Sequence, residues 1–165
     1  MPRETLDLNV IILEVLALIG DEAKSHGVTI RTQFADALSP VDGDRVQLQQ
    51  VLLNLTMNAI QAMSDVTGRE RRLVISTRNV DKDQVQVTVE DSGTGLDPDR
   101  ISKIFEPFYT TKSGGMGMGL SICRSILQNH GGRLWATANE GLGASFHFTL
   151  QKHREEQQLA EVAVV

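Results

Sequence analysis

The stretch from Leu48 to Met63 reads LQQVLLNLTMNAIQAM and contains no charged residue. At about 100° per residue, its apolar side chains share one face of a helix: Leu48, Val51, Leu52, Leu55, Ala59, Ala62 and Met63. A second, narrow stripe is polar and consists of Gln47, Gln50, Asn54, Asn58, Gln61 and Asp65. A solvated helix face normally carries Lys and Glu. These amides therefore either bond neighbouring backbone on a partly buried helix or line a polar cavity, where amide oxygens ligate a hard cation such as Mg²⁺.

Helical and strand-like patterns alternate on both sides of this helix. In the first half of the chain we expect a helix from about Asp7 to His26, a strand over 28–34, a loop over 39–44 and the amide helix from Asp44 to about Met63. In the second half we expect strands over 73–77 and 85–89, a helix over 121–130, and strands over 133–137 and 145–150. The turn at Asp81-Lys82-Asp83 predicts an antiparallel hairpin. Antiparallel strands with several helices and no βαβ rhythm predict a two-layer α+β sandwich.

Length and composition limit the classes of function. The chain has 165 residues, 41% of them hydrophobic, which fits one domain with a sizeable core. A net charge of −5 without a Lys/Arg cluster argues against a nucleic-acid partner. The single cysteine, Cys123, excludes an internal disulfide. The longest apolar run, Val10 to Ile19, is shorter than the ~20 residues of a spanning helix, so we expect no direct membrane contact by this domain.

An alternating strand runs into a glycine turn at Asp91-Ser92-Gly93-Thr94-Gly95. One interpretation is an Asx turn that closes the strand, which Asp-Ser-Gly sequences favour. The other is a ligand site in which the Asp91 carboxylate accepts a hydrogen bond from the exocyclic amine of adenine. In that case Gly93 and Gly95 let a planar base approach the backbone.

A glycine-rich loop from Thr110 to Gly119 leads into the next expected helix. Free N–H groups and the helix dipole favour phosphate at such a helix N-terminus. No Gly-Lys-Ser/Thr closes the loop as in a Walker P-loop, and Gly115, Gly117 and Gly119 lack Rossmann spacing. The loop is either a flexible linker or a lid that orders over a ligand. Lys112 is then either the lid cation for a terminal phosphate or an ordinary exposed lysine.

Five short motifs, in one order, resemble the boxes of histidine-kinase catalytic domains. They are residues 54–59 (NLTMNA) for the N box, 91–95 (DSGTG) for the first glycine box, 105–108 (FEPF) for the F box, 115–120 (GMGMGL) for the second glycine box and 141–146 (GLGASF) for the third. The resemblance implies a catalytic ATP-binding domain over residues 1–152 and a frayed tail over 153–165. The phosphoacceptor (dimerisation) and sensor domains of such a kinase are not found in this sequence.

The resemblance implies the Bergerat fold, in which a mixed sheet packs on helices and ATP binds between them under a glycine-rich lid. It implies that Asn58 ligates Mg²⁺ at the triphosphate, with Asn54 one turn earlier on the same wall. It further implies that Asp91 reads the adenine amino group, that Gly93 and Gly95 admit base and ribose, that Lys112, Gly115, Gly117, Gly119 and Leu120 contact phosphates, and that Ser145 supplies a hydroxyl beside Asp91. Asn58 and Lys112 are the expected catalytic residues.

The implied function is to bind Mg-ATP and to donate its γ-phosphoryl group to a histidine on a separate helical phosphoacceptor domain of the same kinase, with a response regulator downstream. Asn54 stands where related ATPases carry a Glu general base, and an amide cannot take that role. This favours phosphoryl transfer over hydrolysis. Two alternatives remain open, a serine protein kinase of the anti-sigma type and a non-catalytic module whose docking depends on nucleotide. We expect a monomeric fragment in the cytoplasm, whether or not the parent protein is membrane-anchored.

The four histidines do not fit a phosphoacceptor motif, in which His is followed by Glu. His26 and His130 precede glycines at helix ends, His147 lies in a strand pattern and His153 lies near the tail. We expect all four to be structural or surface residues. The chain is therefore expected not to autophosphorylate without its acceptor domain.

Overall fold

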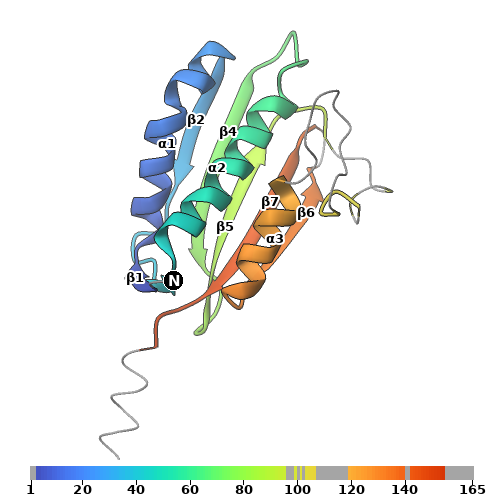
Figure 1. Ribbon diagram of the computed structural model, residues 1–165. Coiled ribbons are helices and arrows are strands. Elements are labelled where there is room, and N and C mark those ends of the chain that lie inside the picture. The colour runs from blue at the N-terminus through green and yellow to red at the C-terminus, as the bar shows by residue number, and fades with distance from the viewer. Residues whose placement is uncertain are drawn as a thin grey trace, which may run out of the picture.

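The computed structural model describes residues 3–95, 99, 101, 103–106, 119–139 and 142–154. In chain order its elements are β1 (Glu4–Leu6), α1 (Leu8–Ser25), β2 (Val28–Gln33), β3 (Val41–Gly43), α2 (Arg45–Ala62), β4 (Arg71–Asn79), β5 (Gln84–Asp91), α3 (Gly119–Asn129), β6 (Arg133–Ala138) and β7 (Ala144–Gln151). The helices lie side by side on one face of the main sheet, with α2 between α1 and α3 (Figure 1). This is the two-layer α+β sandwich that the sequence predicted.

The main sheet has five strands in the order β2-β4-β5-β7-β6. β2 and β4 are parallel, and the other neighbouring pairs are antiparallel, so the sheet is mixed. The β4–β5 connection is the predicted hairpin, and the Asp81 carboxylate accepts hydrogen bonds from the N–H groups of Asp83 and Gln84 in its turn.

The sequence pattern shows no β-α-β rhythm, but the fold contains one such unit. The chain leaves β2, passes through α2 and returns in β4, which pairs with β2 in parallel. Strand-like spacing of apolar residues marks a strand but not its direction. The sequence therefore could not show which strand pairs with β2.

A second, two-stranded sheet pairs β1 with β3, where the sequence predicted only a loop. Three residues are too few to show a period-two pattern, and the pairing joins segments far apart in the chain. Close to this sheet, the His153 N–H donates to the Pro40 carbonyl at 2.8 Å and the His153 Nδ1 lies 2.7 Å from Asp42 Oδ1. The contacts of the domain thus extend one residue past the predicted boundary at 152.

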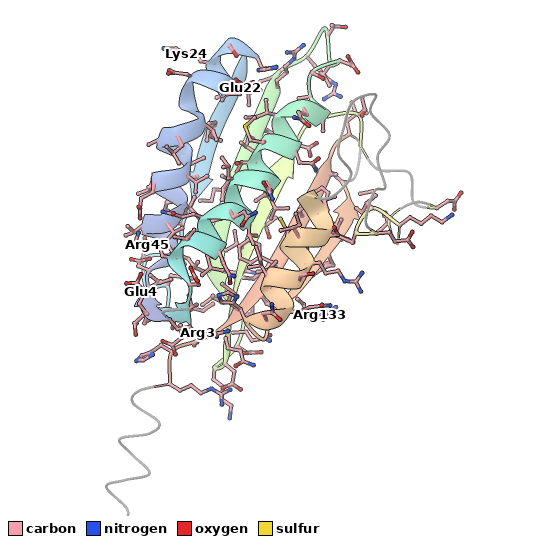
Figure 2. The ribbon with its side chains drawn as sticks, in the orientation of Figure 1. Arg3, Glu4, Glu22, Lys24, Arg45 and Arg133 are labelled. Carbon is pink, nitrogen blue, oxygen red and sulfur yellow. The ribbon has the colours of Figure 1, made fainter. Side chains whose placement is uncertain are left out.

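The two long helices begin where their capping residues predict. The Asp7 carboxylate accepts from the Asn9 N–H at the start of α1, and the Asp44 carboxylate accepts from two N–H groups at the start of α2. Arg45, the first residue of α2, forms ion pairs with Glu4 and Glu14, and Figure 2 shows Arg45 beside Glu4. These contacts tie the start of α2 to β1 and α1.

The core lies between the helix layer and the sheet. Its α2 members are Leu48, Val51, Leu52, Leu55, Ala59 and Ile60, which largely match the predicted apolar face. Fully burying one such aliphatic side chain contributes roughly 1.5–3 kcal/mol. Within the parts of the chain that the structure describes, no helix is both long and apolar enough to cross a membrane.

His130 joins the end of α3 to the start of α2. Its Nδ1 lies 2.8 Å from the Ile126 carbonyl, and the Asp44 N–H donates to its Nε2 at 3.1 Å. Because one ring nitrogen must donate and the other must accept, the ring is the neutral tautomer with hydrogen on Nδ1. Gly43 makes room for it, since a Cβ there would lie 3.0 Å from the imidazole. The prediction of a structural role for this histidine is confirmed.

Replacing His130 by Phe keeps a ring in the buried site but leaves the Asp44 N–H without an acceptor. We expect the free energy of unfolding to fall by about 1–3 kcal/mol, measured by urea denaturation. His26→Phe, at the partly exposed end of α1, should change it by less than about 0.5 kcal/mol. Equal effects of the two substitutions would contradict the bridging role.

Candidate functional site

The amide stripe of α2 forms one wall of the candidate site. Asn54 and Asn58 are partly exposed beside the buried apolar face of the helix. The Asn54 Nδ2 lies 4.0 Å from the position that a Cβ would take on Gly119, and the Cys123 thiol on α3 donates to the Val51 carbonyl of α2 at 3.8 Å. Among the described residues the Asn58 side chain has no hydrogen-bonding partner. Its amide oxygen can therefore accept from, or ligate, a molecule bound at this wall.

Asp91 lies at the end of β5 and is only 3% exposed. Its Oδ1 accepts hydrogen bonds from the Gly93 N–H at 2.8 Å and from the Ala144 N–H at 3.3 Å. The first of these bonds is the Asx turn that the sequence allowed. Both bonds fall on Oδ1, so Oδ2 accepts from none of the described residues. The Asx turn and a ligand-reading carboxylate are thus compatible.

The Asp91 carboxyl has a raised pKa, and burial is its main cause. The two N–H groups of Gly93 and Ala144 act in the opposite direction because they stabilise the carboxylate, and so does the Arg69 charge. The nearby Glu90 carboxylate adds to the increase. A buried carboxylate whose charge is only partly compensated gains from a further hydrogen-bond donor, which is what an exocyclic amine supplies.

Three glycines let the turns around Asp91 meet closely. A Cβ on Gly93 would lie 2.6 Å from the Ala62 carbonyl oxygen, and one on Gly143 would lie 2.0 Å from the Asp91 carbonyl oxygen. Gly95 has φ +89° and packs against Gly143. The missing side chain of Gly93 is required by packing against α2, and its predicted role in admitting a ligand stays a prediction. The importance of Gly143 escaped the sequence-based site prediction.

The predicted placement of the Ser145 hydroxyl beside the Asp91 carboxylate is corrected by strand alternation. Ser145 pairs with Glu90 across β5 and β7. Its side chain therefore lies on the opposite face of the sheet from the Asp91 side chain. Its hydroxyl donates to Asn139 Oδ1 at 2.6 Å, and the Asn139 Nδ2 donates to the main-chain carbonyl of Asp91 at 3.2 Å. The atom that meets the carboxylate from this strand is the N–H of Ala144.

Arg69 and Ser92 support the glycine turn, and the sequence analysis did not identify either. The Arg69 guanidinium donates to the carbonyl oxygens of Ser92 and Gly93. The Ser92 hydroxyl donates to the Glu70 carbonyl and accepts from the Arg72 N–H. An arginine in a polar loop and a serine in a turn carry no periodic signal, so only the folded arrangement reveals their contacts.

Part of the predicted phosphate site lies outside the described residues, namely Lys112, Gly115 and Gly117. The described part begins at Gly119, the first residue of α3, and Leu120 packs against the core. Of the F box, Phe105 is buried and meets Phe146 edge to face, with ring centroids 6.2 Å apart. Its Pro107 and Phe108 lie outside the described residues.

The two ends of the candidate site lie at different positions along α2. Ala62 meets the Asp91 turn through Gly93, whereas Asn54 meets the start of α3 at Gly119. Eight residues of α-helix span about 12 Å, and Asn58 lies halfway. The described residues contain no group of three or more His, Cys, Asp or Glu side chains that could hold a metal ion. A single amide oxygen is a fitting protein ligand for Mg²⁺, which usually keeps several waters and substrate phosphate oxygens.

A family model described as histidine kinase-, DNA gyrase B-, and HSP90-like ATPase matches residues 43–154. The sensor histidine kinase TmoS of Ectopseudomonas mendocina is 37% identical over 146 residues, which cover 88% of this chain and 15% of TmoS. The sensor protein FixL of Bradyrhizobium diazoefficiens is 43% identical over 143 residues, which cover 87% of this chain and 28% of FixL. The chain thus spans less than a third of the length of these relatives.

Solved structures show the same fold. The catalytic domain of histidine kinase ThkA superposes with a TM-score of 0.80 at 33% identity, covering 92% of this chain and 99% of that domain. Full-length ShkA in complex with AMPPNP superposes with a TM-score of 0.81 at 26% identity, covering 92% of this chain and 32% of ShkA. With its mixed sheet, its helix layer and its order of boxes, the chain belongs to the family of histidine kinase-, DNA gyrase B- and HSP90-like ATPases.

Proposed function

We propose that the chain binds ATP with Mg²⁺ and donates the γ-phosphoryl group to a histidine on a separate helical phosphoacceptor domain. The observation that carries the proposal is the Asp91 corner, where two main-chain N–H groups hold Oδ1 of a buried carboxylate and none of the described residues donates to Oδ2. Such an acceptor suits the amino group of adenine and opposes the carbonyl of guanine. The nucleotide then lies along α2 with its phosphates toward Gly119.

Relatives support the signalling role. TmoS and ZraS are sensor histidine kinases, ShkA has been solved with AMPPNP, and ThkA has been solved in complex with the response regulator protein TrrA. By analogy, the partners of this chain are a phosphoacceptor domain and a response regulator. The chain itself supplies the nucleotide site.

The residues beside the phosphate end favour transfer over hydrolysis. The Asn54 amide cannot take a proton from an attacking water, because it has no basic form near neutral pH. Burial raises the pKa of the neighbouring Cys123 thiol to about 11, so the thiol stays protonated and is no base either. An imidazole that arrives from another domain brings its own lone pair and needs no such base.

Each box has a separate part in the proposed reaction. Asp91 orients the base, and Asn58 offers an oxygen for Mg²⁺, which when bound neutralises charge on the phosphates. Gly119 presents the N-terminus of α3 to them. Catalysis then rests on positioning and electrostatics rather than on covalent chemistry by this chain.

Asp91→Asn tests the base-reading role. The amide keeps an oxygen for the Gly93 and Ala144 N–H groups but turns an NH₂ donor toward the adenine amine, so two donors face each other. We expect ATP affinity, measured by calorimetric titration, to fall about 100-fold. Asp21→Asn, on the exposed side of α1, makes the same change in charge and should bind ATP like the wild type.

Stability separates this effect from misfolding. A carboxyl whose folded-state pKa is raised contributes stability at low pH, which is lost as the pH rises through that pKa. At neutral pH Asp91→Asn should therefore be as stable as the wild type or more so, and the difference should shrink on acidification. A strongly destabilised variant at neutral pH would show that Asp91 serves the fold instead.

Asn58→Ala tests the transfer itself. The chain is incubated with ATP labelled in the γ-phosphate and with the helical phosphoacceptor domain of the parent kinase. We expect transfer to fall about 100-fold or more, whereas Gln61→Ala, an exposed amide one turn further along the same stripe, should retain it.

The chemistry of the label identifies the acceptor. Phosphohistidine is labile in acid and phosphoserine is not, so an acid-stable product would favour the serine-kinase alternative. Unchanged transfer by Asn58→Ala would refute its proposed role. ATP binding without any transfer would favour the docking module.

A further inference from the structure

The face of the main sheet that points away from the helices forms a surface of its own. Figure 1 shows α1, α2 and α3 on the opposite face. Along β5 the helix-facing side chains are Val85, Val87 and Val89, and the alternate positions point outward. The strand register continues this alternation across β2, β4, β7 and β6. The outward positions therefore form one continuous face, here called the outer face.

The outer face is basic although the chain is acidic. Its charged residues are Arg31, Arg72, Arg78, Arg133 and a single acid, Glu90. Four arginines and one glutamate give +3, and the whole chain carries −5. The remaining residues thus carry −8, that is, −5 minus +3. The sequence showed no Lys/Arg cluster because the arginines come from three different strands.

The four arginines are exposed and have no ionic partners within the described chain. Arg45, on the helix side, contrasts with them because it pairs with two glutamates. An arginine without an ionic partner is available for carboxylates, which its guanidinium binds in a planar, two-pronged geometry.

Hydrogen bonds hold the polar side chains of the outer face in place. The Arg78 Nη2 donates to Gln86 Oε1 at 3.2 Å, and the Gln86 Nε2 donates to Thr88 Oγ1 at 3.3 Å. The Thr88 hydroxyl lies 2.9 Å from His147 Nδ1, and His147 Nε2 lies 2.9 Å from Thr137 Oγ1. The chain of bonds crosses four strands. It orders the face before any partner arrives, which lowers the entropic cost of binding.

An aromatic platform lies at the β6 end of this chain of bonds. Trp135 stacks on His147 with centroids 5.2 Å apart and planes at 21°, and the Arg133 guanidinium lies 5.2 Å from the Trp135 centroid. Figure 2 places Arg133 at the start of β6. Tryptophan and arginine are enriched among the residues that dominate binding energy at protein interfaces.

The free outer face also contains an unsatisfied polar atom. Thr149 pairs with Gln86 on one side and Arg133 on the other, and its buried hydroxyl has no hydrogen-bonding partner among the residues that the structure describes. Buried hydroxyls in folded proteins usually have partners. The hydrogen-bonding capacity of the side chains around Thr149 is therefore not fully used.

The size of the outer face selects the kind of partner. Five strands about 4.8 Å apart make it about 19 Å wide, and strands of six to nine residues make it about 20–30 Å long. The resulting flat footprint is about 400–600 Å², at the low end for a stable protein–protein interface, in which each side buries roughly 800 Å² of accessible surface. A second copy of this chain or a whole globular surface would need more area. A short segment does not.

We propose that the outer face binds a carboxylate-rich segment of a partner protein. Carboxylates of the segment pair with Arg31, Arg78 and Arg133, and its chain packs across Trp135. Nucleic acid fits less well, because Glu90 lies among the arginines and the whole chain is acidic. The proposal does not rest on the nucleotide site, which lies on the other face of the sheet.

Trp135 provides a direct readout because it is the only tryptophan of the chain. The full 165-residue chain is titrated at low ionic strength with a capped peptide of about a dozen residues in which Glu alternates with Gly, and Trp135 emission is followed. We expect saturable binding that weakens as salt screens the charges. A peptide with Gln in place of Glu should not bind.

Matched charge variants locate the site. R31Q/R78Q removes two arginines of the outer face but leaves the Arg133–Trp135 contact, and we expect about tenfold weaker binding. K24Q/R124Q makes the same change in charge on α1 and α3 and should bind like the wild type; Lys24 lies at the far end of α1 (Figure 2). Circular dichroism is used to check that both variants are folded.

Three results would overturn the proposal. They are the absence of peptide binding by the folded wild type, equal binding by the two double variants, and displacement of the peptide by single-stranded DNA that binds more tightly. The last result would make the outer face a nucleic-acid surface. None of these outcomes depends on whether the chain binds ATP.

Discussion

The meeting of Asp91 with the third glycine turn is the constraint on which the site depends. The backbone of Gly143 approaches the Asp91 carbonyl so closely that a Cβ would lie 2.0 Å away, and the next residue, Ala144, gives its N–H to the Asp91 carboxylate. This contact is possible only because β5 and β7 pair in one antiparallel register, so that β5 ends where β7 begins. Because Gly93 has no side chain, the same turn packs closely against the Ala62 carbonyl of α2. Sheet, helix layer and buried carboxylate are thus fixed together.

The same arrangement makes the ionised carboxylate of Asp91 costly for the fold. Burial opposes ionisation of Asp91, and two N–H groups and the Arg69 charge compensate only in part. Under the proposed function, a ligand that brings one more donor relieves this imbalance. The end of the wall near Gly119, where we propose that the phosphates bind, follows a different principle. There the partly exposed Asn54 and Asn58 present amides without charge, and α3 presents its N-terminus.

Local patterns predicted the elements well, since helix caps, apolar stripes and the hairpin turn each depend on neighbouring residues. The amide stripe and the Asp91 turn were also visible, because unusual residue types stand at regular positions. The parallel β2–β4 pair, the β1–β3 pair and the Arg69 contacts were not, because each joins segments distant in the chain. Ser145 shows the limit of motif matching, since a shift of one residue in a strand moves a side chain to the other face. The basic outer face could not be predicted either, because its arginines come together only when the sheet forms.

The most direct test of the account removes the donor that Asp91 is proposed to read. ATP and the triphosphate of purine riboside, which lacks only the 6-amino group, are titrated calorimetrically into the chain with Mg²⁺ present. The account predicts that loss of the amino group weakens binding about 100-fold or more, because the buried Oδ2 of Asp91 is then left unpaired. Equal affinity for the two nucleotides would contradict it and would mean that the Asp91 corner is architecture rather than a reader of the base.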